Sequence, residues 1–382
     1  MKIAIPKERR AHERRVAASP DTVKKLIGLG FQVTVESGAG LASSITDEAF
    51  QSAGATVAPD AKAAFADADL VLKVQRPLLA GEGDDIDELA LMKQGALLLG
   101  TLSPHSTPDA LQAYAKAGIT ALALELIPRI TRAQSMDILS SQSNLAGYRA
   151  VLDAAYEYNR AFPMMMTAAG TVAPARVMVL GAGVAGLQAI ATAKRLGAIV
   201  SATDVRPAAK EQVESLGGKF VMVESEETRE AETAGGYAKE MSEDYKRRQA
   251  ELVAETLKKQ DMVICTALIP GRPAPTLIND EMVHSMKPGS VIVDLAVEQG
   301  GNCTLSKPGE VVEVNGVKIV GHYNVPSRIA ADASLLYAKN LLNFITPLVN
   351  AEKQLDINWE DEILAAVTLT RDGNIVHPNF QK

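Results

Sequence analysis

Three glycines, at positions 181, 183 and 186, form the pattern with the clearest chemical meaning in this chain of 382 residues. They directly follow an apolar run at residues 177–180 and precede a stretch with helical character at residues 187–196. In a strand–turn–helix of this kind, Gly181 would permit the tight turn, Gly183 would let a pyrophosphate approach the backbone, and Gly186 would let the helix pack closely on the strand. The first amides of the helix would bind the phosphates. The spacing therefore predicts a dinucleotide-binding site.

Asp204 is the candidate for binding the sugar of that dinucleotide. It ends the next β-branched run and is the eighteenth residue after Gly186, close to the spacing at which an acid accepts hydrogen bonds from ribose hydroxyls. Its carboxylate would repel a 2′-phosphate, so Asp204 favours NAD over NADP. Arg206, two residues further on, leaves NADP open because its guanidinium could bind that phosphate.

Two series of short β-branched runs, separated by helical stretches, surround these residues. Such alternation is typical of βα units and of largely parallel sheets. The first series places strands at residues 2–5, 31–36, 70–74, 96–101 and 119–124. The second series places them at residues 176–180, 199–204, 219–223, 262–266, 290–295 and 317–320. We therefore expect an α/β protein with two doubly wound, Rossmann-like parallel-sheet domains.

Two long helical patterns suggest the domain boundaries. Residues 136–158 carry apolar side chains at helical spacing and are long enough to join two domains. Residues 329–345 form a second apolar pattern, followed by a hairpin turn at residues 372–373, and should pack back onto the first domain. We expect an N-terminal domain of residues 1–139 plus 325–382 and a dinucleotide-binding domain of residues 140–324, with the cofactor in the cleft between them. The polar stretch between Val223 and Leu252 is predicted to be a mobile surface loop.

The composition is that of an ordinary globular chain, and it disfavours several classes of function. Apolar residues make up 47% and charged residues 22% of the chain. The net charge of −7 disfavours a nonspecific grip on nucleic acid. No run approaches the ~18 apolar residues of a membrane span, and the first residues lack the apolar core of a signal peptide. Cys265 and Cys303 are far apart and the five histidines lack metal-ligand spacing, so we expect reduced thiols and no metal.

Long runs of the sequence resemble two related families. The start of the chain, the stretch around Lys73 and residues 294–301 resemble alanine dehydrogenase. More specific runs are P-R-I-T-R-A-Q-S-M-D at residues 128–137, S-S-Q-S-N-L-A-G-Y-R-A at 140–150, G-G-Y-A-K at 235–239 and T-A-L-I-P-G-R-P-A-P at 266–275. These resemble the NAD(H)-binding alpha subunit (domain I) of proton-translocating NAD(P) transhydrogenase. The resemblance covers almost the whole chain.

The transhydrogenase resemblance implies roles for residues at matching positions. Tyr237 would lie on a mobile loop that closes over the cofactor. The other residues implied at the nicotinamide end are Arg129, Gln134, Asp137 and Ser140. The residues predicted or implied to bind the rest of the cofactor are Gly181, Gly183, Val184, Gly186, Asp204, Val205, Arg206, Gly236, Gln249, Ala267 and Leu268. Without the resemblance, Arg129 and Asp137 would fit a surface ion pair, and Tyr237 a solvated loop aromatic.

The chemistry of hydride transfer separates the two families. Alanine dehydrogenases have a histidine after the fifth strand of the first domain, whereas residues 97–104 contain none and His105 lies outside the pattern. At the position of that family's aspartate this chain has Glu298. Reducing a carbonyl requires a general acid or base. Hydride transfer between two nicotinamide rings requires no such group and depends on positioning, so the missing histidine favours the transhydrogenase.

The transhydrogenase resemblance also implies partners, because the sequence shows one nucleotide site and the reaction needs two. A partner domain would bind NADP(H), and a transmembrane subunit would couple hydride transfer to proton translocation. The chain would be a homodimer, cytoplasmic and peripheral on the inner face of the membrane through these subunits. Two alternatives stay open. One is an alanine dehydrogenase-like amino acid dehydrogenase in which Arg15 and Lys73 bind a substrate carboxylate, and the other is a non-enzymatic NAD(H)-sensing module.

Overall fold

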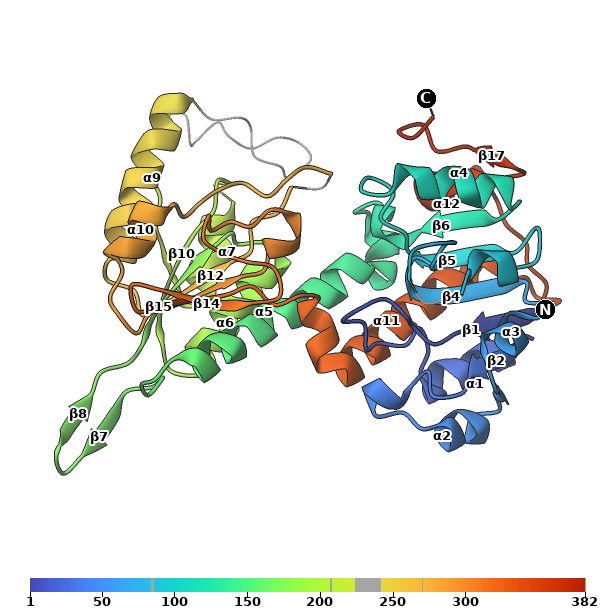
Figure 1. Cartoon of the computed structure of the whole chain (residues 1–382), viewed down its shortest axis with the longest axis horizontal. Coiled ribbons are helices and arrows are strands. Elements are labelled where there is room, and N and C mark those ends of the chain that lie inside the picture. The colour runs from blue at the N-terminus through green and yellow to red at the C-terminus, as the bar shows by residue number, and fades with distance from the viewer. Residues whose placement is uncertain (84–85, 207, 224–241, 270, 382) are drawn as a thin grey trace. The chain divides into compact units, whose positions relative to one another are not determined.

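The protein, a computed structural model, is described over residues 1–83, 86–206, 208–223, 242–269 and 271–381. The chain folds into two compact units (Figure 1). The first unit comprises Met1–Gln142 with Pro326–Lys382, and the second unit comprises Ser143–Val325. Helix α5, Ile138–Glu157, begins in the first unit and ends in the second. The sequence predicts domain boundaries after residues 139 and 324. That independently folding domains meet at these positions stays a prediction.

An eight-stranded sheet forms the centre of the first unit, in the order β17-β16-β6-β5-β4-β1-β2-β3. The strands from β6 to β3 pair in parallel, while β16 pairs antiparallel with both β6 and β17. The bounds are β1 Lys2–Ile5, β2 Gln32–Glu36, β3 Thr56–Ala58, β4 Leu70–Gln75, β5 Leu97–Thr101, β6 Thr120–Ala123, β16 Thr368–Arg371 and β17 Asn374–Ile375. The inner strands are almost wholly buried, as expected of a parallel sheet covered on both faces.

Helices build a separate core on each face of this sheet. Along β1, Ile3 and Ile5 enter one core and Ala4 enters the other, as the alternation of a strand requires. The helices with side chains in the first core are α1 Pro20–Gly28, α2 Asp47–Ser52, α11 Ala330–Ile345, α12 Glu362–Val367 and the start of α5. Those with side chains in the second core are α3 Ala61–Phe65 and α4 Pro108–Lys116. Short 3-10 turns, including η4 Thr131–Met136, connect these elements.

The second unit contains a seven-stranded sheet in the order β11-β10-β9-β12-β13-β15-β14, parallel except for the pairing of β14 with β15. Its first strand, β9, lies between β10 and β12, so the sheet order reverses beside β9. The strands are β9 Arg176–Leu180, β10 Ile199–Thr203, β11 Lys219–Phe220, β12 Met262–Cys265, β13 Val291–Asp294, β14 Val311–Val314 and β15 Val317–Val320. Besides the larger part of α5, the helices in the described part of this unit are α6 Val184–Arg195, α7 Ala209–Ser215, α9 Glu243–Leu257 and α10 Asp280–Ser285.

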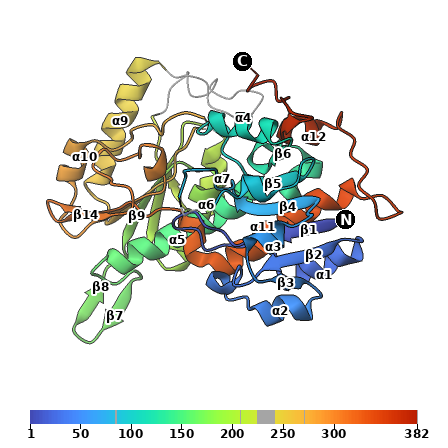
Figure 2. The same ribbon diagram turned by 45° about the vertical axis from the view of Figure 1, so that its right-hand side comes forward.

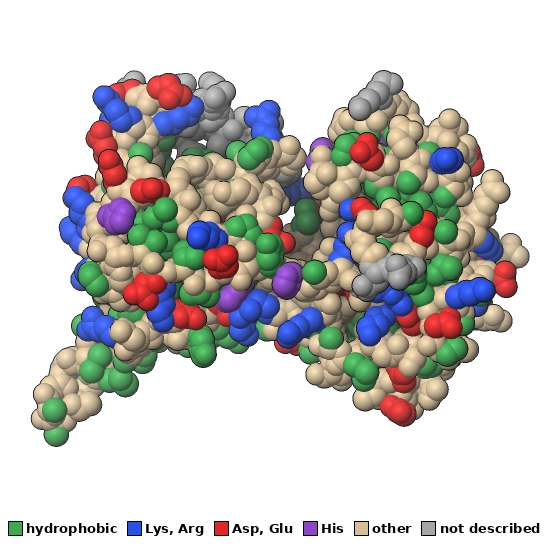
Figure 3. Space-filling view, in the orientation of Figure 1, with side chains coloured by type: hydrophobic (Ala, Val, Ile, Leu, Met, Phe, Trp, Pro, Cys, Tyr) green, Lys and Arg blue, Asp and Glu red, His purple; other side chains and the backbone are tan. Residues whose placement is uncertain are grey.

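A separate two-stranded hairpin, β7 Met165–Thr167 and β8 Gly170–Val172, belongs to the second unit. It extends away from the seven-stranded sheet in both ribbon views (Figures 1 and 2). Hydrophobic side chains lie on its surface (Figure 3), and Met166 is 80% exposed. This hairpin was not predicted from the sequence.

The structure confirms the predicted α/β class and every strand of the two predicted series. The hairpin turn at residues 372–373 is also confirmed, between β16 and β17. The loop predicted between Val223 and Leu252 was wrong near its end, because α9 begins at Glu243; residues 224–241 lie outside the described residues. Helix α6 begins at Val184, three residues earlier than predicted. Among the described residues, every helix is too short or too polar to span a lipid bilayer.

Candidate functional site

The three glycines of the predicted dinucleotide site lie between β9 and α6, where the sheet order of the second unit reverses. Gly181 has a φ of +98°, a left-handed conformation that favours glycine. Its amide donates to the carbonyl oxygen of Thr203 at 2.9 Å, which holds the turn to the end of β10. Gly183 is the N-cap of α6. In open α/β sheets, ligands bind at the carboxyl ends of the strands at such a reversal point.

The space around each glycine differs. A Cβ at Gly186 would lie 1.8 Å from the carbonyl oxygen of Gly181, so α6 packs on the turn more closely than a side chain permits. A Cβ at Gly183 would meet nothing within 4 Å. A second close approach, which was not predicted from the sequence, is that of Gly147 on α5, where a Cβ would lie 2.0 Å from the carbonyl oxygen of Ala185. The open space at the N-terminus of α6 fits a phosphate group.

Asp204 follows β10 and is held by hydrogen bonds to both carboxylate oxygens. Its Oδ2 accepts from the amide of Ala182 at 2.7 Å, and Arg206 donates from Nε to Oδ1 at 2.9 Å and from Nη2 to Oδ2 at 3.0 Å. Burial raises the pKa of the Asp204 carboxyl, but the hydrogen bonds from Arg206 and the two amides outweigh burial, and the pKa is lowered. An ionised Asp204 can accept from ribose hydroxyls and disfavours a 2′-phosphate.

Gln249 on α9 lies beside the same end of β10. Its Nε2 donates to Oγ1 of Thr203 at 2.8 Å, and its Oε1 accepts from the amide of Val223 at 2.9 Å. Thr203 precedes Asp204 directly, so the structure brings Gln249 to the ribose side of the predicted site.

Ala267 and Leu268 follow β12, on the other side of β9. The buried side chain of Asn302 accepts from the amide of Ala267 at 3.0 Å and donates to its carbonyl oxygen at 2.8 Å. The backbone amide of Ala267 therefore already donates a hydrogen bond within the protein. Asn302 was not predicted from the sequence; the only signal was its position directly after residues 294–301, which resemble alanine dehydrogenase.

Three apolar side chains of the predicted site are exposed, each close to the carboxyl end of one of three adjacent strands. Val184, after β9, is 40% exposed, Val205, after β10, is 51% exposed, and Leu268, after β12, is 45% exposed. Exposed apolar side chains at the rim of such a site can pack against a planar base.

In the first unit, Asp137 and Ser140 lie together at the start of α5. Ser140 donates from its amide to Oδ1 of Asp137 at 2.9 Å and from Oγ to Oδ2 at 2.5 Å. Gln134, in η4, and Arg129, before η4, have exposed side chains. The structure thus brings Asp137 and Ser140 into contact and places Gln134 on the turn that precedes them. Gly236 and Tyr237 lie outside the described residues.

Comparison with known proteins shows the family of the chain. Residues 4–146 match the family model "Alanine dehydrogenase/PNT, N-terminal domain", and residues 150–378 match "Alanine dehydrogenase/PNT, C-terminal domain". The chain is 65% identical to a protein of Rhodospirillum rubrum named as the first part of "NAD(P) transhydrogenase subunit alpha", over 99% of this chain and 98% of the relative. The chain belongs to the NAD(P) transhydrogenase alpha-subunit family. The predicted resemblance is therefore confirmed.

Other relatives of this transhydrogenase family member agree. A protein of the same description from Rickettsia prowazekii is 48% identical over 99% of this chain and 96% of the relative. The crystal structure of transhydrogenase from Sinorhizobium meliloti is 56% identical, covers 98% of this chain and 100% of that chain, and has a TM-score of 0.88. An L-alanine dehydrogenase structure is 28% identical, covers 100% of this chain and 98% of that chain, and has a TM-score of 0.82.

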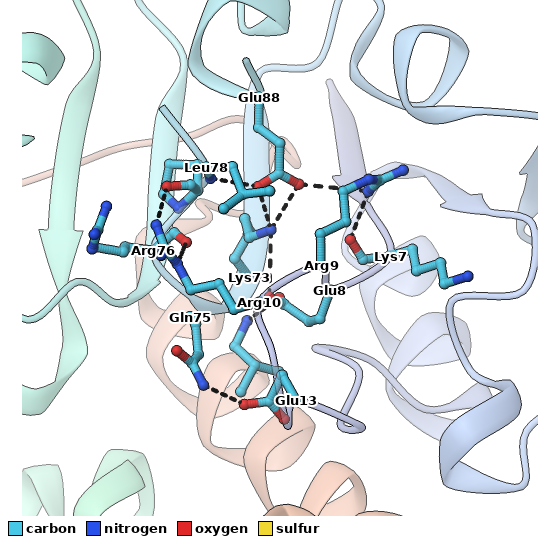
Figure 4. Close-up of polar contacts among 12 residues, drawn as sticks. Lys7, Glu8, Arg9, Arg10, Glu13, Lys73, Gln75, Arg76, Leu78 and Glu88 are labelled. Atoms are coloured by element: carbon cyan, nitrogen blue, oxygen red, sulfur yellow. Dashed lines mark hydrogen bonds and ion pairs between the residues drawn. The ribbon is translucent and has the colours of Figure 1, made fainter. Parts of the chain in front are cut away.

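The likeness to alanine dehydrogenase makes the state of Lys73 informative, because the alternative function assigns it to a substrate carboxylate. Lys73 is 1% exposed and donates to both carboxylate oxygens of Glu88, each at 2.9 Å (Figure 4). A second carboxylate, of Glu8, lies 3.4 Å from its Nζ. In this transhydrogenase family member, the buried carboxylate of Glu88 therefore neutralises the lysine.

Arg15 is likewise paired with side chains of the protein. Its Nε and Nη2 donate to the two oxygens of Glu13 at 2.8 and 2.7 Å, and its Nη1 donates to Oε1 of Gln142 at 2.8 Å. Only 8% of Arg15 is exposed. Since Arg15 also has an ion-pair partner, neither cation is left for a small carboxylate.

His105, the nearest histidine to the position of the alanine dehydrogenase histidine, packs in the first unit against the C-terminal segment. Its ring centroid lies 5.0 Å from that of Phe380 in an edge-on contact. His105 therefore contributes to the packing of the C-terminal segment.

Proposed function

We propose that this chain is the NAD(H)-binding subunit of a proton-translocating nicotinamide nucleotide transhydrogenase, transferring a hydride between NAD(H) and NADP(H) bound on a partner domain. The name of the 65% identical relative supports the proposal, as does the strand–turn–helix at Gly181–Gly186. The observation that carries the choice over an amino acid dehydrogenase is Lys73, whose charge is taken up by the buried carboxylate of Glu88, with Glu8 beside it.

The chain's own residues would bind and orient the cofactor. The open space at Gly183 and the first amides of α6 fit the pyrophosphate, and the ionised Asp204 fits the adenosine ribose. Arg129, Gln134, Asp137, Ser140 and Tyr237 are proposed to surround the nicotinamide ring. The cofactor supplies the hydride from the ring carbon C4. The protein has to hold two such carbons at near-attack distance and exclude water, and it needs no general acid for this.

Partners follow from the same proposal. A second nucleotide, NADP(H), would be bound by a partner domain, and a transmembrane subunit would link hydride transfer to proton movement. We propose that the chain is a homodimer, cytoplasmic and held at the inner face of the membrane through these subunits. Sedimentation velocity of the purified chain should give the mass of a dimer at micromolar concentration, and a monomer would contradict this portion of the proposal.

The decisive experiment is reconstitution with the NADP(H)-binding partner. The mixture should show NADH-dependent reduction of an NADP analogue, and each component alone should show none. No transfer by the mixture, with NADH binding intact, would refute the proposed function and favour an NAD(H)-sensing module.

The purified chain alone tests the alternative enzyme. With NADH, pyruvate and ammonia we expect no turnover, because Arg15 and Lys73 are both paired with carboxylates. Robust NADH oxidation in this assay would make the chain an alanine dehydrogenase-like enzyme instead.

A further inference from the structure

Two amide side chains of α11 hold the segment of the first unit that carries Asp137 and Ser140. Asn343 donates from Nδ2 to the carbonyl oxygen of Ser135 at 2.9 Å, and Asn340 makes two hydrogen bonds to the segment. Asn340 donates from Nδ2 to the carbonyl oxygen of Ser135 at 2.9 Å and accepts at Oδ1 from Oγ of Ser141 at 2.7 Å. It is only 7% exposed. One of these hydrogen bonds is made to Ser135, two residues before Asp137, and the other is made to Ser141, the residue after Ser140.

Further contacts from the first unit fix the same segment. Oγ of Ser141 also accepts from Nε2 of Gln142 at 3.1 Å, and Gln142 in turn accepts from Nη1 of Arg15 at 2.8 Å. Gln142 also donates from Nε2 to the carbonyl oxygen of Ala333 on α11 at 3.1 Å. A buried polar network whose members are all hydrogen-bonded holds one geometry. Within the described part of the chain, Arg15 thus belongs to a network that ends at the Asp137–Ser140 segment.

We propose that Asn340 is a positioning residue for the nicotinamide site. It acts through the backbone of Ser135 and the hydroxyl of Ser141, and so fixes where Asp137 and Ser140 stand. This inference rests on the proposed function, in which those two residues face the nicotinamide ring. Hydride transfer between two rings depends on positioning, and a displacement of about 1 Å is enough to slow such a reaction about a hundredfold.

The test is Asn340→Leu, which keeps the approximate size of the side chain and removes both hydrogen bonds. In the full chain reconstituted with its NADP(H)-binding partner, kcat for reduction of the NADP analogue should fall about tenfold to a hundredfold. The affinity for ADP-ribose, which lacks nicotinamide, should stay within about threefold, because the predicted adenosine side lies in the second unit. A kcat within about twofold of the wild type would overturn the inference.

Ser334→Ala is the matched control on the same helix. Ser334 is fully buried, accepts from the amide of Val16 at 3.0 Å and lies 2.8 Å from the hydroxyl of Ser43, and neither contact involves residues 131–141. This variant should lower the Tm while kcat stays within about twofold of the wild type. If Ser334→Ala slows the reaction as much as Asn340→Leu at the same loss of Tm, the effect is one of stability and the inference fails.

Ser141→Ala is a second variant should Asn340→Leu not fold. It removes one of the two bonds to Asn340, and kcat should fall about threefold to tenfold with unchanged ADP-ribose affinity. An unchanged kcat would contradict the inference. An inactive wild-type mixture would overturn the proposed function and the inference with it, whereas an active wild type with a fully active Asn340→Leu variant would overturn the inference alone.

Discussion

Lys73 and Glu88 form a two-point ion pair in which Nζ lies 2.9 Å from each carboxylate oxygen and both side chains are 1% exposed. Glu88 also accepts from the amide of Leu78 at 2.7 Å, so its carboxylate holds a loop as well as the lysine. The same lysine, viewed from the sequence alone, is a candidate for binding a substrate. Its environment decides between these roles, because a buried cation already saturated by carboxylates has no charge left for a ligand.

Lys73→Met should lower the free energy of unfolding by about 3–5 kcal/mol, the range for removing one partner of a buried ion pair. The substitution removes the ammonium group from between the buried carboxylates of Glu88 and Glu8, and leaves Glu88 only the longer 3.6 Å contact with Arg9. Urea unfolding at pH 8, followed by circular dichroism, measures the loss. The control is Lys25→Met, since Lys25 is 56% exposed in its ion pair with Asp21 and its loss should cost less than about 0.5 kcal/mol. Equal small losses for both variants would contradict the prediction.

Glu8 should make the stability of the protein depend on pH near neutrality. Burial raises the pKa of Glu8 to about 7 from its ordinary 4.5, with Lys73 opposing the rise and Glu13 and Glu88 adding to it. Between pH 4.5 and about 7, the folded protein therefore holds a proton on Glu8 that the unfolded chain has lost. Stability from this group is fully present below pH 4.5 and is lost as the pH rises toward 7, by on the order of 3 kcal/mol.

Glu8→Gln checks the pH dependence, because glutamine stays neutral at every pH. It also keeps an acceptor for the amide of Val74, which donates to Oε1 of Glu8 at 2.7 Å. The free energy of unfolding, measured in urea from pH 5 to pH 8, should fall less steeply with pH in the variant than in the wild type. Parallel profiles would mean that Glu8 does not titrate in this range.

The strands could be predicted from the sequence where both faces of a sheet are covered. Strands such as β4 and β12 are buried along almost their whole length, and burial of both faces produces the continuous apolar runs that mark them. β14, at the edge of its sheet, alternates exposed and half-buried residues and gave no such run. The first part of helix α9, residues 243–251, was taken for a loop because Tyr245 is the one buried residue in this charged stretch.

The candidate site could be predicted where its residues are neighbours in sequence. The glycine turn and Asp204 lie within one strand–turn–helix–strand unit, so their spacing alone carries the signal. Asn302 and Asn340 could not be found in this way. Asn340 is 205 residues from the carbonyl it binds, and only the packing of α11 on η4 brings the two together.

Asp204→Asn should weaken NADH binding about tenfold to a hundredfold, because hydrogen bonds from ribose hydroxyls to a charged acceptor contribute about 1.5–3 kcal/mol. Binding of NADPH should change less, since the substitution also removes the negative charge that repels a 2′-phosphate. The turn should survive because the amide of Ala182 keeps an oxygen acceptor. Fluorescence titration with both nucleotides measures the preference. Asp244→Asn, at a 59% exposed position on α9, is the control and should bind as the wild type does.

The glycine turn offers a pair of substitutions that separate folding from binding. Gly186→Ala should destabilise the second unit by about 1–3 kcal/mol, because its Cβ would lie 1.8 Å from the carbonyl oxygen of Gly181 and α6 would have to shift. Gly183→Ala should cost at most about 1 kcal/mol, since its Cβ meets nothing within 4 Å and its φ of −75° suits alanine. Its methyl group would stand where the pyrophosphate is proposed to approach, so NADH affinity should fall at least about tenfold. Thermal unfolding measures the stability of each variant, and NADH titration measures its affinity. A wild-type NADH affinity in Gly183→Ala would show that the pyrophosphate does not pass over this glycine.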